Sequence, residues 1–194
     1  MVAHNDKPIV APTSQGDWHD WLVENSAASD GVRVQLVKKS STLPGISYAE
    51  ALDEALCFGW IDGQSNSLDD DFFLQSFTPR RPRSVWSQRN RDHIARLLAE
   101  GRMQPSGLTQ VDAAKADGRW DAAYSQGDAV PDDLQAAIDA SPVASAFFPT
   151  LSSQNRFAII FRTNSVKRAE TRTRKITEFV AMLERGETIY PQKP

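Results

Sequence analysis

The stretch SYAEALDEALCFGWIDGQS (residues 47–65) contains the start of a helix, its end and the beginning of a strand. Ser47 is a typical N-cap residue, and Glu50 follows it at the capping-box position. The mainly apolar residues behind them continue the helix to Phe58. Gly59 tolerates positive φ and is expected to end it. Residues 60–65 then predict a strand, so helix and strand alternate at this point of the chain.

The neighbouring segments extend this pattern into a small antiparallel sheet flanked by helices. Residues 32–38 alternate apolar and polar side chains around β-branched residues, which predicts a strand. A second hairpin strand over residues 72–78 follows the polar connection SLDDD. Residues 15–25 predict an amphipathic helix, because their large apolar residues recur at helical spacing. Three short strands need such helices to cover them, so the fold class is α+β.

Helical patterns replace strands after Pro82. Ser84 or Ser87 is expected to begin a helix that Gly101 ends, and further helix signals recur as far as Gly186. We therefore expect four parts. They are a flexible N-terminal tail (1–14), an α+β unit (15–102), an all-helical C-terminal unit (103–187) and a short tail (188–194).

The composition is that of a folded protein with an ordinary acidic balance. The chain has 194 residues and a formal net charge of −3. Hydrophobic residues make up 40% of it, which is sufficient for a core. Its one cysteine cannot form an intrachain disulfide, as is typical of a reducing compartment. The first residues lack a basic segment followed by an apolar one, and no run reaches the ~18 apolar residues of a membrane span. We expect a cytoplasmic protein with no membrane span.

Positive charge is concentrated in two blocks. Residues 80–102 contain seven arginines against two acids, and residues 156–175 contain seven basic residues against one acid. The rest of the chain is strongly acidic. Each block therefore either pairs with acids elsewhere in the fold or forms a positive patch.

The sequence lacks the residue patterns that several chemical functions require. The three histidines are dispersed, and no His or Cys pair has metal-ligand spacing. Cys57 lies between apolar neighbours, as a small core residue does. Gly59 and Gly63 lack the third glycine of a dinucleotide site, and neither a G-x-S-x-G elbow nor a phosphate loop is present. We expect no metal and no cofactor.

Asp62 is unusual because aspartate is unfavourable within a strand. Alternation places Trp60, Asp62 and Gln64 on one face of the predicted strand. One interpretation is a structural salt bridge between Asp62 and an arginine among residues 80–83. The other is an acid that lines a ligand cleft, with Trp60 and Gln64 beside it.

The first basic block includes PRRPR, which its two prolines hold extended. Arg80, Arg81, Arg83 and Arg89, together with Trp86, are candidates for a surface that stacks on an anionic ligand and pairs with its charge. The alternative is a set of structural ion pairs.

The second block places Lys167 and Arg168 at the predicted start of a helix, with Arg174 further along. Helix N-termini favour acids, so cations there break a local rule, and such breaks often mark functional sites. A phosphate or carboxylate would satisfy both the cations and the free backbone N–H groups. The alternative is a solvent-exposed face whose positive charge is balanced by Glu170 and by the acids at 69–71.

Four stretches of the chain together resemble a known family: ALDEALCFGWIDGQ, FLQSFTPRRPRSVWSQRN, AEGRMQPSGLTQVDAAKADGRW and SVKRAETRTRKITEFVAMLERGE. Between about Trp18 and Tyr190 the sequence resembles the YdeI/OmpD-associated, or bacteriocin-protection, family. The resemblance implies a role in tolerance of bacteriocins or antimicrobial peptides. It also implies an N-terminal part like the YjbR/CyaY-like group and an association with a porin. A porin partner would require export, for which the sequence shows no signal.

Three functional hypotheses follow from these observations. The leading one is a non-enzymatic cytoplasmic stress or resistance protein that binds an anionic small molecule or an acidic protein surface through its arginines. The second is an enzyme with Asp62 as acid or base in an arginine-lined cleft. The third is nucleic-acid binding, against which the net charge argues because it requires both blocks to form one basic stripe.

Overall fold

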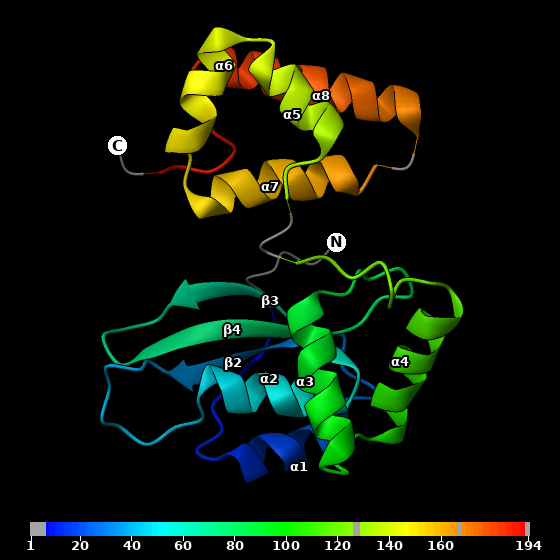
Figure 1. Cartoon of the computed structure of the whole chain (residues 1–194). Coiled ribbons are helices and arrows are strands. Elements are labelled where there is room, and N and C mark those ends of the chain that lie inside the picture. Colours follow the sequence, from blue (N-terminus) through cyan, green and yellow to red (C-terminus); the bar gives the residue numbers. More distant parts are fainter. Residues whose placement is uncertain (1–6, 126–128, 167, 193–194) are drawn as a thin grey trace. The chain divides into compact units, whose positions relative to one another are not determined.

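The computed structural model describes residues 7–125, 129–166 and 168–192. The chain divides into two compact units, the first ending at Ala123 and the second beginning at Tyr124 (Figure 1). The first unit contains a four-stranded sheet with helices, which confirms the α+β class. Among the described residues, no helix combines the length and apolar character that a membrane crossing requires.

The sheet of the first unit is mixed. Its strands, in spatial order, are β1 (Ile9–Val10), β2 (Val32–Val37), β4 (Phe72–Pro79) and β3 (Trp60–Ser67). The β2–β4 and β3–β4 pairs are antiparallel, as predicted, but β1 runs parallel to β2. A purely antiparallel sheet was therefore the wrong expectation. A strand of two residues is too short to produce an alternating pattern, so its segment was expected to be a tail.

Four helices complete the first unit, and local signals set their ends. They are α1 (Gln15–Asn25), α2 (Tyr48–Cys57), α3 (Gln88–Ala99) and α4 (Pro105–Ala116). Ser47 and Glu50 form the predicted capping box, and Ser87 caps α3. Gly59 adopts φ +78° directly after α2, as expected for a helix-ending glycine. Figure 1 shows α1, α2 and α3 beside the sheet, where their apolar faces share one core with β2 and β4.

Helix α4 packs on the core of the first unit. Val111 and Ala114 of α4 are buried in the first core. Gly107 lies so close to the end of α2 that an added Cβ would sit 2.1 Å from the Cys57 carbonyl oxygen. The boundary between the units consequently falls after Ala123, whereas the sequence analysis placed it after residue 102.

The second unit has its own core. Its elements are α5 (Asp132–Asp139), α6 (Pro142–Phe147), the 3-10 helix η1 (Phe148–Thr150), α7 (Ser153–Asn164) and α8 (Ala169–Glu184). Leu134, Ile138, Ile159 and Leu183 are almost completely buried at its centre. The segment after α8 was expected to be a tail, but it attaches to α7. The buried Asn155 accepts a hydrogen bond from the Tyr190 N–H at 2.8 Å and donates one to the Tyr190 carbonyl at 3.0 Å.

Candidate functional site

The first basic block begins where the sheet ends. Arg80 follows the last residue of β4, and its N–H donates a 3.0 Å hydrogen bond to the Gly59 carbonyl. Reciprocal bonds between Arg81 and Ser84 close a turn: the Ser84 N–H donates to the Arg81 carbonyl at 2.9 Å, and the Arg81 N–H to Ser84 Oγ at 3.0 Å. This turn fixes the backbone between β4 and α3.

Arg80 and Trp86 form the interior of this loop. The Arg80 guanidinium carbon lies 3.6 Å from the centroid of the Trp86 ring, and Nη1 donates to the Val85 carbonyl at 3.2 Å. Trp120 meets Trp86 edge to face with ring centroids 4.9 Å apart. Arg80 is 5% exposed and Trp86 2%. The expectation that Trp86 stacks on a ligand therefore fails, because the protein itself covers the ring.

Four other arginines of the block have no acid partner among the residues that the structure describes. Arg81, Arg83 and Arg89 are exposed, and Arg91 is half-buried with its guanidinium carbon 5.1 Å from the Trp120 ring centroid. Within the described part of the chain, none of the four forms an ion pair. The first turn of α3, which contains Arg89, has no acid. We call Arg81, Arg83, Arg89 and Arg91 the arginine surface.

The two remaining arginines bind buried acids of α2. Arg96 Nη2 lies 2.7 Å from both carboxylate oxygens of Asp53, and Arg102 Nη2 lies 2.5 Å from Glu54 Oε1. Asp53 is 9% exposed and Glu54 5%. The hydrogen bond with Asp53 raises the pKa of Arg96, which is therefore held as a cation. These pairs neutralise acids that would be costly to bury alone.

Two histidines extend this network, which the sequence analysis missed. His93 Nδ1 lies 2.8 Å from Asp53 Oδ1, and His19 Nδ1 lies 2.9 Å from Glu54 Oε2. The network joins α1, α2 and α3. One signal in the sequence could have indicated it: two adjacent acids stand in the middle of a largely apolar helix and need partners.

The three candidates on β3 have different environments. Trp60 is 1% exposed and donates from Nε1 to the Ser26 carbonyl at 3.3 Å, so it is a core residue without surface for a ligand. Asp62 is half-buried, and its Oδ2 accepts a 2.9 Å hydrogen bond from the Tyr48 hydroxyl. That bond takes the place of the ion pair with an arginine of 80–83 that one of the two interpretations of Asp62 predicted. Gln64 is exposed within a bulge between Asp62 and Ser65.

Tyr48 connects Asp62 to the arginine surface. The Arg89 guanidinium carbon lies 5.7 Å from the Tyr48 ring centroid. Burial, and secondarily the charge of Asp62, raise the pKa of the Tyr48 phenol above its ordinary value. The phenol therefore stays protonated at neutral pH and donates to Asp62, while Arg89 lies over its ring.

Three cations of the second basic block, Arg172, Arg174 and Lys175, form ion pairs within the second unit. Arg172 binds both carboxylate oxygens of Asp133 at 2.6 and 2.8 Å. Arg174 and Lys175 lie 3.8 and 3.2 Å from the carboxylate of Glu178. These acids differ from the residues 69–71 that the alternative interpretation named.

The start of α8 retains one candidate of the predicted anion site. Arg168 is the exposed N-cap residue and makes no side-chain capping bond. Lys167 lies outside the described residues. Glu170 stands in the first turn of α8, where an acid suits the positive end of the helix.

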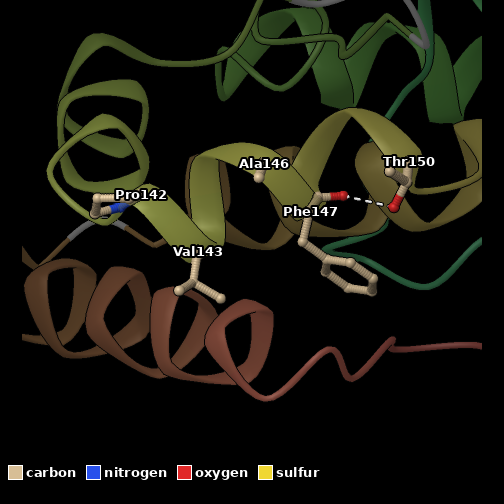
Figure 2. Close-up of a pocket in the computed structure, with 5 residues that line it drawn as sticks. All are labelled: Pro142, Val143, Ala146, Phe147 and Thr150. Atoms are coloured by element: carbon tan, nitrogen blue, oxygen red, sulfur yellow. Dashed lines mark hydrogen bonds between the residues drawn. The ribbon is translucent and has the colours of Figure 1, made fainter.

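A shallow hollow of about 470 Å³ lies along α6 (Figure 2). Its lining consists of Pro142, Val143, Ala146, Phe147 and Thr150. Thr150 donates from Oγ1 to the Phe147 carbonyl at 2.8 Å, which leaves an essentially apolar lining without ionisable groups. This hollow has no residues for acid, base or nucleophilic chemistry. The described residues also contain no group of three or more His, Cys, Asp or Glu side chains arranged to hold a metal.

Comparison with known proteins gives matches to two family models. No curated protein and no solved structure matches, so the likeness of the first unit to the YjbR/CyaY-like group stays a prediction. The model described as "Bacteriocin-protection, YdeI or OmpD-Associated" matches residues 129–186, within the second unit. The GWIDG and FTPRRPRS motifs lie instead within residues 10–110, which match the model "Domain of unknown function (DUF8412)". The chain therefore belongs to the DUF8412 family, and its residues 129–186 match the bacteriocin-protection, YdeI or OmpD-associated family.

Proposed function

We propose that this chain is a non-enzymatic stress or resistance protein of the cytoplasm, and that its arginine surface binds an acidic partner protein. The observation that carries the proposal is the set of four guanidiniums without an acid partner among the described residues. The match of residues 129–186 supports the bacteriocin-protection role. The free thiol of Cys57 agrees with a reducing compartment.

Guanidinium chemistry supports an acidic partner. Arginine offers a planar fork of donors that matches a carboxylate with two parallel hydrogen bonds. The turn at Arg81 and Ser84 and the contact of Arg91 with Trp120 restrict the backbone and one side chain before binding. Groups ordered in advance lose less entropy when a partner binds. Exposed arginines on a loop and one helix turn suit a partner that presents several acids.

The environment of the tryptophans favours a protein over a nucleic acid. Proteins that bind single strands usually offer aromatic rings on which bases stack. Trp86 is covered, and Trp120 is half-buried against it.

A binding titration tests the proposal. Fluorescent polyglutamate is titrated with the full chain at low salt, and a single-stranded oligonucleotide of similar length serves as the second probe. Arg81→Ala combined with Arg83→Ala is expected to weaken polyglutamate binding roughly fivefold, since each exposed ion pair contributes up to about 1 kcal/mol. The matched control, Arg168→Ala with Arg174→Ala, removes the same charge from the second unit and is expected to bind as the wild type does.

Two outcomes would contradict the proposal. If the Arg81/Arg83 variant and the wild type bind polyglutamate with the same affinity, the arginine surface is not the binding site. Tighter binding of the oligonucleotide than of polyglutamate, with a steep salt dependence, would indicate a nucleic-acid-binding protein.

A further inference from the structure

Strand β3 forms an outer edge of the sheet in the first unit. In the described part of the chain, the strand order β1-β2-β4-β3 leaves β3 with one neighbour, β4 (Figure 1). Among the described residues, the main chain of residues 61–67 makes hydrogen bonds only with β4. These bonds are the strand ladder and the bond that the Gln75 side chain donates to the Gly63 carbonyl. An edge strand presents a row of N–H and C=O groups with which another strand can pair.

Apart from one bulge, this edge lacks the features that usually prevent such pairing. Residues 63–67 (GQSNS) are exposed and contain no charged residue and no proline. Lysine, proline or a very short strand commonly protects an edge. The opposite edge, β1, has only two residues. The bulge between Asp62 and Ser65 bends β3 but leaves regular pairing from Ser65 to Ser67.

The two ends of β3 differ in charge. Trp60 pairs with Pro79, so the loop that contains Arg81 and Arg83 continues from this end of the hairpin. At the other end, the hairpin connection contains Asp69 and Asp70. Asp70 is exposed and makes no hydrogen bond or ion pair with any described residue. A strand added at this edge would meet cations at one end and a carboxylate at the other.

We propose that the β3 edge takes up an extended peptide segment of the partner as an additional strand, with acidic side chains at the end nearest Arg81 and Arg83. This inference rests on the proposed function and specifies the form of its acidic partner. Main-chain hydrogen bonds supply affinity in this mode of recognition, and side-chain contacts supply specificity. The arginines select acidic residues at one end, and Asp70 disfavours them at the other.

Peptides methylated on their backbone test the inference. The probe is a fluorescent peptide of about ten residues, a usual strand length at its upper end. Its acidic residues lie in one half, and threonine and valine fill the other. One derivative has N-methyl groups at the odd positions and a second at the even positions. In a strand, N–H groups alternate between the two sides. Strand addition therefore requires free N–H groups at only the odd or only the even positions of the peptide. One derivative is expected to lose at least about tenfold in affinity for the full chain, and the other to bind nearly as the parent does.

Each remaining outcome overturns a definite part of the account. Equal binding of both derivatives, with a loss in the Arg81/Arg83 double variant, would overturn strand addition and leave the arginine surface intact. No binding of the parent peptide or of polyglutamate would overturn the proposed function itself. Sedimentation that shows a dimer which the peptide cannot dissociate would assign the edge to a second copy and also overturn the inference.

Discussion

The two basic blocks contain the same number of cations, but the fold treats them differently. In residues 80–102, Arg96 and Arg102 pair with acids of α2, whereas the arginine surface has no acid partner among the described residues. In residues 156–175, Arg172 pairs with Asp133, and Arg174 and Lys175 lie near Glu178. Among the described residues, Arg156 and Arg162 instead contact the Pro149 carbonyl and Tyr190, and Arg168 forms no ion pair. The comparison teaches that a cluster of charge along a sequence does not measure free charge. The acids that other elements contribute decide how much of it remains.

The pairs in the two blocks also differ in burial. Asp53 and Glu54 are buried among three helices, so their arginines compensate charges removed from water. Asp133 is about half exposed, and solvent already screens its charge. The first block should therefore contribute to stability through its interior members and leave its exterior members available for binding. The ion pairs of the second block should contribute little to stability.

The largest expected effect lies inside the first block. Trp86→Ala removes a buried ring that Arg80 and Trp120 contact, and it should lower the free energy of unfolding by about 3–5 kcal/mol. Urea denaturation measures this change. Arg81→Ala, a few residues away, is the control and should stay within about 0.5 kcal/mol of the wild type. Equal losses in both variants would show that the block does not divide into interior and surface members.

A smaller loss is expected at the buried acid of α2. Glu54→Ala leaves Arg102, His19 and Gln15 without the carboxylate that they contact, and it should cost about 1–3 kcal/mol in the free energy of unfolding. Urea denaturation compares Glu54→Ala with Glu178→Ala, a variant in the second block, under the same conditions. A larger cost for Glu178→Ala would reverse the proposed order of the two blocks.

The smallest effect is expected at the exposed pair of the second block. Arg172 lowers the pKa of Asp133, chiefly through its side-chain hydrogen bonds. A lowered pKa in the folded state stabilises the protein above the unfolded pKa, and this contribution disappears as the pH falls through the folded value. Asp133→Asn should therefore cost up to about 1 kcal/mol at neutral pH and nothing near pH 2. Thermal unfolding at several pH values checks this, and a difference that grows toward low pH would have the wrong sign.

Local signals in the sequence predicted most of the first unit. Ser47 with Glu50, Ser87 and Gly59 each determine a helix end within a few residues, so their effect is readable from the chain. Packing between distant segments was not readable in this way. The contact of Gly107 with Cys57 attaches α4 to the first core, and no local pattern indicates it.

The candidate site shows the same division. The sequence identified Arg81 and Arg83 as residues with a possible role in binding, and their exposure agrees with that role. It could not separate them from Arg96 and Arg102, whose partners lie 43 and 48 positions away. It also could not indicate that Arg80 covers Trp86, because the stacking depends on the turn between them. Separating free arginines from paired ones required the positions of the acids on α2.

Chemical modification of arginines tests the central claim most directly. The wild-type full chain reacts with phenylglyoxal in the presence and absence of polyglutamate, and mass spectrometry measures the extent of reaction at each arginine. The account predicts that Arg81, Arg83, Arg89 and Arg91 react readily and become protected when polyglutamate is added, while Arg168 and Arg174 react equally in both conditions. Protection at Arg168 and Arg174, with none on the arginine surface, would contradict the account.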